Sequence, residues 1–420
     1  MRDEEIAAVR VLLEDFVAEV FVSLPRKDQR AKGSLYLRGL MLDGRRKSMQ
    51  PMGARLGVDH QQLQQFVSSS PWAVEPVRRR LANLAVDTIA PEAWVIDDTG
   101  FKKDGPSSPC VARQYSGTLG KIGNCQIAVS VHAATDSASC PLNWRLYVPE
   151  AWDDGCADTN DEAARIQARR SSAKIPDTIR HRTKWSLALE MIDEAAVWGL
   201  TPPVVVADAG YGDTTGFRLG LEERSIPYVL AVKGSTSAYP AGAVPETVPT
   251  TPGRGRPSAP RYRKKASSLR ELATAAGRKE LHQATWRHGT KAGPGNRTAA
   301  MKSRFLALRI RPANRDIPLS PDGTLPEAWM LAEWPPNEPA PTDYWISDLP
   351  ADTLLKTLVR LAKMRWRIEH DYRELKTGLG LSHFEGRAFT GWHRHVTLVT
   401  AAHLFITRLR LTTPKAAGAA

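Results

Sequence analysis

The sequence predicts an α/β protein with a mixed sheet, a helical N-terminal region and a β-rich insertion. Three observations predict this class. Apolar residues recur at helical spacing up to about residue 90, and short apolar runs then alternate with amphipathic helices to about residue 234. Strand-like segments follow to about residue 345, and the chain is then helical almost to its end.

The N-terminal region, residues 1–90, contains a candidate helix-turn-helix. Met49–Leu56 fits a short helix, Gly57–Asp59 a turn and His60–Val67 a second helix. The second helix would present Gln61, Gln62, Gln64 and Gln65, and glutamine amides can read base edges. A plain helical hairpin explains the spacing equally well, so both interpretations stay open. On the first, this region is a DNA-binding domain in which Gln61 and Gln62 contact DNA.

The first part of the α/β core is expected at residues 91–234. Its strands are short apolar runs, at 93–100, 125–134, 144–149, 204–208 and 227–232. Its helices are amphipathic, at 183–199 and 217–225. Three strands in a row, followed by alternating helices and strands, indicate a mixed sheet.

A basic, β-rich insertion is expected at residues 235–345. After a loop rich in Pro, Gly and Ser, segments alternate as in antiparallel strands, at 281–291, 303–312, 327–335 and 343–349. Between Gly253 and Pro312 there are sixteen Lys and Arg residues and two acids. Such a surface suits phosphate contacts. The core is expected to resume as helices at 346–412, before a disordered tail at 413–420.

Composition narrows the class of partner. The formal net charge of +13 and a pI near 9.7 indicate a polyanionic partner. The sequence shows no targeting segment and no apolar stretch of the roughly 18 residues that a membrane span needs, which leaves nucleic acid. The four cysteines form no C-x-x-C pair. We expect reduced thiols in a cytoplasmic protein, with a structural zinc site as the alternative.

Three carboxylates stand out as candidate metal ligands. Asp97, followed by Asp98, ends one apolar run, and Asp208 ends another. Glu369 lies in the charged stretch 363–381, which is expected to be one helix. Taken alone, each Asp has a structural explanation, as the cap of a helix or a turn. Three carboxylates that converge at a sheet edge, however, can hold two divalent metals.

The cations near Glu369 fit this hypothesis. On a continuous helix Arg365, Arg373 and Lys376 share one face with Glu369. They would hold DNA phosphates beside the acid, which positions DNA without reading its sequence.

These motifs resemble those of insertion-sequence transposases that carry an Asp-Asp-Glu triad on a ribonuclease-H-like sheet. Within that family, the chain resembles the group with a β-rich domain between the second Asp and the Glu. VIDDTGFKKDG resembles the first-acid motif, VVVADAGYGD the second, and RWRIEHDYRELKTGLGLSHFEGR the third-acid helix. ARQYSGTLGKIGNCQ, WRHGTK and GWHRHVTL look like the seven-oh-one subgroup of insertion sequences. The resemblance covers roughly residues 45 to 410.

The resemblance implies a ribonuclease-H-like catalytic core in which Asp97, Asp208 and Glu369 hold two Mg²⁺ ions, with Mn²⁺ able to substitute. The family pattern of an acid, any residue and then Ser or Thr selects Asp97, with Thr99 as the polar follower. Asp98 is the alternative first acid, because strand alternation places only one of the two on the catalytic face.

The spacing Tyr-x2-Arg-x3-Glu-x6-Lys is met by Arg365, Glu369 and Lys376. Ala362 stands at the Tyr position, so any role of that hydroxyl is absent or supplied elsewhere.

Other residues are candidates for DNA contact. Lys102 and Lys103 follow the first acids and would contact the cleaved strand, although a solvated loop is an equally plain explanation. Trp286 would stack on a flipped base or pack in the core. Arg287 and Lys291 would hold phosphates in the basic insertion.

The activity implied is cut-and-paste DNA transposition: metal-dependent cleavage at transposon ends, then strand transfer into target DNA. The partners implied are double-stranded DNA, as terminal inverted repeats and target, and a second copy in a synaptic homodimer. A bacterial cytoplasmic, nucleoid-associated location fits. The alternative is a transposase-derived DNA-binding protein without cleavage activity. A glycosidase with paired carboxylates explains neither the positive charge nor the basic insertion.

Overall fold

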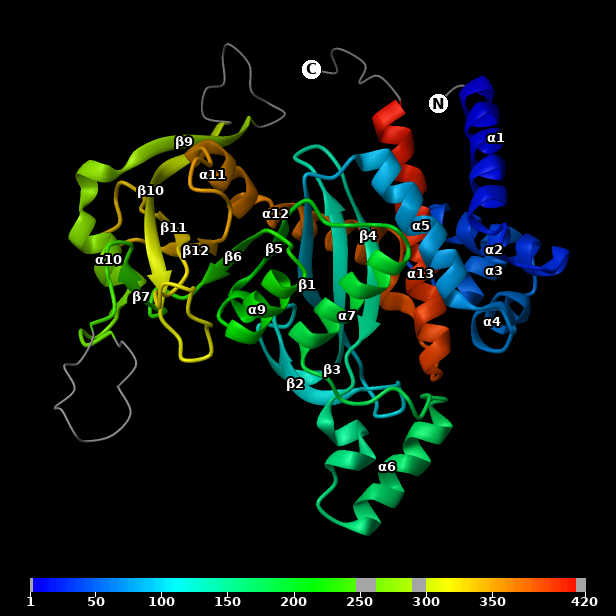
Figure 1. The fold of residues 1–420 in the computed structure, drawn as a ribbon. Helices are drawn as coiled ribbons and strands as arrows, with labels where there is room; N and C mark the ends of the chain where they lie inside the picture. The colour runs from blue at the N-terminus through cyan, green and yellow to red at the C-terminus, as the bar shows by residue number, and fades with distance from the viewer. Residues whose placement is uncertain (1–2, 247–261, 289–299, 413–420) are drawn as a thin grey trace. The chain divides into compact units, whose positions relative to one another are not determined.

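The computed structural model describes residues 3–246, 262–288 and 300–412. The chain divides into two compact units, the first made of residues 1–201 and 366–420 and the second of residues 202–365 (Figure 1). The N-terminal helices therefore share the first unit with the strands up to residue 146. The predicted core strands after residue 201 group with the β-rich segment in the second unit.

Five helices open the first unit: α1 (Asp3–Val20), α2 (Lys27–Met41), α3 (Met49–Leu56), α4 (His60–Ser68) and α5 (Val74–Ile89). The two helices and the turn of the candidate helix-turn-helix are confirmed, with α4 extending to Ser68. Gly57 ends α3 at a φ of 67°, a left-handed conformation that side chains with a Cβ disfavour. Asp59 then caps α4 by accepting a hydrogen bond from the Gln61 backbone N–H at 2.9 Å.

The sheet of the first unit is antiparallel. It contains β1 (Ala93–Lys102), β2 (Ala112–Ser116), β3 (Lys121–Ala134) and β4 (Ser139–Leu146). β3 pairs with each of the other three, and Asp97 of β1 lies opposite Ser130 of β3. The predicted strand at 144–149 instead begins at Ser139, because pairing with β3 already starts there. The short β2 was not predicted; its side chains are mostly exposed or half-buried, which leaves no apolar run.

Helices cover this sheet. α7 (Lys184–Val197) packs on one face, and α5, α12 (Trp366–Arg373) and α13 (Phe389–Thr412) pack on the other (Figure 1). α13 confirms the predicted C-terminal helix and is buried along most of its length. α6 (Asn160–Ser172) was not predicted. It buries only Ile166 and Arg170, so its sequence has almost no apolar periodicity.

The stretch 363–381 is not the single helix that was predicted. α11 (Leu355–Lys363) ends before a turn at Met364 and Arg365, and α12 starts at Trp366. A π-helical turn, Glu374–Gly378, then replaces the expected α-helical continuation. A π turn holds an extra residue, so the i+7 spacing from Glu369 no longer places Lys376 on the same face. Charge pattern alone does not report such a break.

The second unit contains a mixed sheet, as predicted. Its strands are β5 (Val205–Ala207), β6 (Tyr228–Val232), β7 (Ser237–Pro240), β8 (Ser267–Ser268), β9 (His282–His288), β10 (Ala300–Pro312), β11 (Ala328–Glu333) and β12 (Asp343–Ser347). The order is β5-β6-β12-β11-β10-β7-β8, with β9 also on β10. β5 and β6 are parallel, and the pairs β9–β10, β10–β11 and β11–β12 are antiparallel, as expected for the β-rich segment.

The helices of the second unit are α8 (Ala209–Gly212), α9 (Thr215–Glu223), α10 (Leu269–Ala276) and α11. α8 and α9 connect the parallel strands β5 and β6, which need such a crossover. α10 was not predicted; its start is fixed by a capping box between Ser268 and Glu271.

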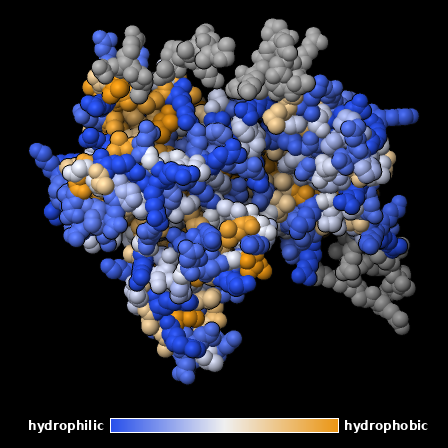
Figure 2. Space-filling view, turned by 180° about the vertical axis from the view of Figure 1, so that it is seen from behind, coloured by the Kyte–Doolittle hydropathy of each residue, from blue (hydrophilic) through white to orange (hydrophobic). Residues whose placement is uncertain are grey.

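One face is largely hydrophilic and carries a hydrophobic patch (Figure 2). The exposed apolar side chains include Val11 and Leu12 of α1 and Leu411 of α13. Within the described ranges, no helix combines the length and apolar character needed to span a membrane.

Candidate active site

Asp97 and Asp98 face opposite sides of the sheet. Asp97 is 7% exposed, and its charge acts on Tyr372 of α12 and on Lys376 of the π-helical turn. Asp98 points to α7, where its Oδ2 accepts a hydrogen bond from Lys184 Nζ at 2.8 Å. Of the two candidate first acids, Asp97 is the one on the same face as α12.

Lys376 is half-buried and contacts β1, rather than lying on the face of Glu369 as predicted. Its Nζ donates hydrogen bonds to the Gly100 carbonyl at 2.9 Å and to Thr118 Oγ1 at 3.3 Å. It also lies 5.3 Å from the centroid of the Phe101 ring. Burial lowers the pKa of Lys376 to about 8, and the charge of Asp97 opposes this shift. Lys376 therefore keeps a positive charge beside Asp97 below that pH.

Glu369 is exposed on α12, as a metal ligand or DNA contact requires. The opposite side of the helix buries Ile368, Asp371 and Tyr372. Arg373 is exposed one turn after Glu369, so these two share a face as predicted. Arg365 precedes α12 and belongs to the second unit.

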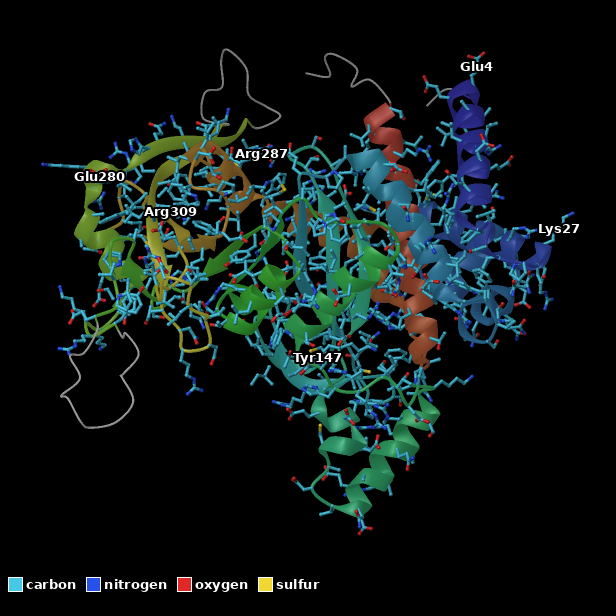
Figure 3. The ribbon with its side chains drawn as sticks, in the orientation of Figure 1. Glu4, Lys27, Tyr147, Glu280, Arg287 and Arg309 are labelled. Carbon is cyan, nitrogen blue, oxygen red and sulfur yellow. The ribbon has the colours of Figure 1, made fainter. Side chains whose placement is uncertain are left out.

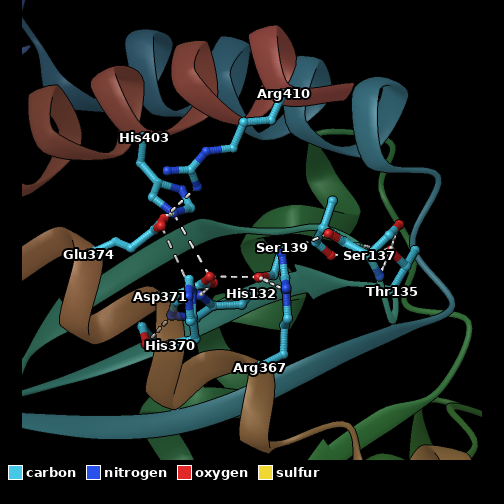
Figure 4. A network of polar contacts seen from close by, with 12 residues as sticks. His132, Thr135, Ser137, Ser139, Arg367, His370, Asp371, Glu374, His403 and Arg410 are labelled. Atoms are coloured by element: carbon cyan, nitrogen blue, oxygen red, sulfur yellow. Dashed lines mark hydrogen bonds and ion pairs between the residues drawn. The ribbon is translucent and has the colours of Figure 1, made fainter. Parts of the chain in front are cut away.

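A buried polar network lies beneath α12 (Figure 4). Asp371 Oδ2 pairs with His132 Nδ1 at 3.1 Å, and Asp371 Oδ1 accepts a hydrogen bond from Ser139 Oγ at 2.6 Å. His403 Nε2 of α13 lies 3.6 Å from Glu374 Oε2, which also accepts from Arg410 Nη1 at 2.8 Å. The network thus joins α12, α13, β3 and β4.

Burial and neighbouring groups shift the pKa values of three residues in this network. Burial raises the pKa of Asp371, but the His132 hydrogen bond and the charge of His403 outweigh it and lower the pKa overall. Burial lowers the pKa of His132 more than Asp371 raises it. The hydrogen bond with His403, together with Arg410, lowers the pKa of Glu374 to about 2.

The sequence patterns did not predict this network. A signal was present, because Ser130 and His132 are polar residues two apart in an otherwise apolar strand and therefore share one face. Their partners, Asp371 and Tyr372, lie in α12 among charged residues that a sequence pattern assigns to solvent. Only the packing of α12 on the sheet identifies them.

Asp208 begins α8 in the second unit. It follows the buried strand β5, is half-exposed, and accepts a hydrogen bond from the Gly210 backbone N–H at 2.9 Å. Gly212 ends α8, and a Cβ there would lie 2.0 Å from the Ala231 carbonyl oxygen of β6. The glycines of this motif thus allow a close approach that holds α8 against the sheet.

Trp286 packs within the second unit. Its ring meets Phe305 edge-on with centroids 5.8 Å apart, and Lys363 Nζ lies 5.2 Å from the Trp286 centroid and 5.1 Å from that of Trp345. Lys363 also pairs with Glu333. Trp286 is therefore one wall of an aromatic cage around Lys363.

The remaining predicted DNA contacts differ in accessibility. Lys102 is exposed, with a side-chain exposure of 73%, 3.9 Å from Asp104. Lys103 instead donates to the Phe384 carbonyl at 2.7 Å, and burial lowers its pKa. Arg287 is half-buried on β9 in the second unit (Figure 3), and Lys291 falls outside the described residues.

The predicted glutamines lie on the outer side of α4. Gln61 is exposed and Gln62 half-buried, whereas Leu63, Phe66 and Val67 are buried against the other helices. This orientation suits the second helix of a helix-turn-helix.

In the described part of the chain, no three His, Cys, Asp or Glu side chains are grouped closely enough to hold a metal ion. The cysteines are free thiols; Cys110, Cys125 and Cys140 are buried and Cys156 is exposed. The structure gives the alternative zinc site no ligand group.

Comparisons with known proteins identify the family. The family model described as "DDE superfamily endonuclease" matches residues 19–293, a span that includes Asp97 and Asp208 and ends before Glu369. A curated relative, "Probable transposase for insertion sequence element IS701" from Microchaete diplosiphon, is 29% identical over 201 residues. The alignment covers 47% of this chain and 47% of that protein, about half of each. These matches confirm the resemblance predicted from the motifs, and the chain belongs to the DDE superfamily endonucleases.

Proposed function

We propose that this protein is a DNA transposase that cleaves transposon ends and joins them to target DNA. The observation that carries the proposal is the buried carboxylate of Asp97 on the face of the sheet covered by α12, the helix that bears Glu369. Family membership and the printed name of the IS701 relative support it. Burying a carboxylate costs free energy unless nearby cations compensate its charge. Bound metal ions beside Asp97 would supply that compensation.

We propose Asp97, Asp208 and Glu369 as the ligands of two Mg²⁺ ions, with Mn²⁺ able to substitute. The three carboxylates are not grouped into a metal site in the described residues, so the proposal rests on donor chemistry. Carboxylate oxygens are the ligands that these hard cations prefer. When bound, two such ions would activate the attacking oxygen and stabilise the leaving oxygen of a phosphodiester. Lys376 would keep positive charge beside Asp97, and Arg373 would hold a phosphate near Glu369.

The substrate proposed is double-stranded DNA, as terminal inverted repeats and target. In the α3–α4 pair, Gln61 and Gln62 of the second helix would contact bases in the major groove. Phosphates would be held by Lys102, Arg365, Arg287 and Lys291. Trp286 and Lys103 are weaker candidates, because the contacts described above occupy them. Hydrolysis at the element end would free a 3′-OH that then attacks target DNA in line.

Several further assignments stay proposals. They are a helical DNA-binding domain at residues 1–90, a ribonuclease-H-like core at 91–234 and 346–412 and a basic insertion at 235–345. A homodimer in the synaptic complex and a cytoplasmic, nucleoid-associated location complete the proposal.

The test is cleavage of a transposon-end duplex with Mg²⁺, with wild type and Glu369→Gln compared. We expect wild type to cut and the variant to bind the duplex without cutting. Equal cutting by both would remove Glu369 from the active site. Binding without cutting by both would indicate a transposase-derived DNA-binding protein.

A further inference from the structure

A chain of hydrogen bonds connects α12 to β3 and back to α12. Figure 4 shows its first two members, Asp371 of α12 and His132 of β3. His132 Nδ1 is hydrogen-bonded to Asp371 Oδ2 at 3.1 Å, and His132 Nε2 is hydrogen-bonded to Ser130 Oγ at 2.9 Å. Ser130 Oγ is in turn hydrogen-bonded to Tyr372 Oη at 2.7 Å. Two side chains of β3 thus connect two neighbouring residues of α12.

The chain connects the elements that carry the two proposed ligands of this unit. Ser130 is fully buried on β3 and is the register partner of Asp97 on β1. Asp371 and Tyr372 follow Glu369 by two and three residues on α12. The hydrogen bonds therefore fix the helix that carries Glu369 to the strand next to Asp97.

Further contacts leave Asp371 no free oxygen. Ser139 Oγ donates to Asp371 Oδ1 at 2.6 Å, and Arg367 Nε donates to Ser139 Oγ at 3.1 Å. Arg367 Nη2 also donates to the Ser137 carbonyl at 2.7 Å. The first turn of α12 is thus joined to β4 and to the turn before it.

Physical chemistry explains why this network would fix a geometry. α12 has only eight residues and leads into a π-helical turn, and so short a helix has little stability of its own. Asp371, His132, Ser130 and Tyr372 are all buried, so a shift of α12 would leave desolvated polar groups without their partners.

We propose that Asp371, His132, Ser130 and Tyr372 are positioning residues that set where Glu369 stands relative to Asp97. They do not touch the metal or DNA; they act through α12. This inference rests on the proposed metal role of Asp97 and Glu369.

The experiment measures Mn²⁺ binding to the full chain by electron paramagnetic resonance of the free ion. Tyr372→Phe removes one hydroxyl of the chain and keeps the ring. The matched control is Tyr36→Phe, which removes another buried tyrosine hydroxyl of the same unit, bonded to His395 Nδ1 at 2.9 Å. Tyr372→Phe should weaken Mn²⁺ binding about threefold to tenfold, because it removes one hydrogen bond of the chain that holds α12. Tyr36→Phe should leave it unchanged.

Each result decides the inference. Unchanged Mn²⁺ affinity in Tyr372→Phe would overturn it, and so would an equal loss in Tyr36→Phe, which would indicate general loosening. If Tyr372→Phe does not fold, Ser130→Ala is judged by the same outcomes. Wild-type affinity in Glu369→Gln would instead overturn the proposed metal site, and with it this inference.

Discussion

Two adjacent acids in β1 have different surroundings, and this difference predicts different mutational effects. Asp97 is buried beside α12, whereas Asp98 pairs with Lys184 at 2.8 Å, with side chains 25% and 34% exposed. Asp97→Asn should lower the rate of DNA cleavage on the order of 10³-fold or more, because it removes a proposed metal ligand. Asp98→Asn should cost at most about 1 kcal/mol of stability and leave cleavage nearly intact. Rates from a single-turnover cleavage assay decide between them, and the reverse order would assign Asp98 as the ligand.

Glu374 gives a prediction about pH. Its pKa is lowered from the ordinary 4.5 to about 2, so its contribution to stability is present above pH 4.5 and is lost as the pH falls toward 2. Glu374→Gln should lower the free energy of unfolding at pH 7 by about 1–2 kcal/mol, after allowance for its partial exposure. The difference from wild type should shrink at acid pH.

Urea unfolding at several pH values measures this effect. Glu14→Gln, at an exposed position of α1 in the same unit, is the control and should show no such difference. A Glu374→Gln penalty that is the same at every pH would mean that packing, not ionisation, is responsible.

At the scale of elements, α8 depends on a glycine. A Cβ at position 212 would lie 2.0 Å from the Ala231 carbonyl oxygen, and backbone cannot move away as a side chain can. Gly212→Ala should therefore destabilise the protein by about 1–3 kcal/mol and slow cleavage, since α8 starts at Asp208. Gly242→Ala in the same unit is the control, because its Cβ would meet nothing within 4 Å. Thermal unfolding and cleavage rates measure both, and equal behaviour of the two variants would contradict the prediction.

The elements around Glu369 show where sequence patterns fail. The charged stretch 363–381 has no Pro or Gly before Gly378, so it predicted one helix. In the structure it is divided between α11, α12 and a π-helical turn. In that turn Leu375 is buried and Lys376 contacts β1. Long-range packing of this kind leaves no periodic signal in the sequence.

At the scale of the whole molecule, the net charge of +13 predicts salt-sensitive DNA binding. Lys102→Gln should weaken binding to all DNA sequences alike and reduce the slope of log affinity against log salt by about 1. The control is Lys233→Gln, which has a matching side-chain exposure, 74% against 73%, and pairs with Asp213 at 3.2 Å. Titrations by fluorescence anisotropy at several salt concentrations measure the slopes. Identical slopes for both variants would remove Lys102 from the DNA interface.

The sequence by itself determined the family, the order of the main helices and strands, and the identity of the candidate acids. It could do so because apolar periodicity and motif order are local properties of the chain. Only the tertiary structure decided that Asp97 rather than Asp98 faces α12, that Lys376 is half-buried against β1, and that Trp286 packs around Lys363. It alone showed the network of Asp371, His132, Ser130 and Tyr372, since partners some 240 residues apart meet only when α12 packs on the sheet.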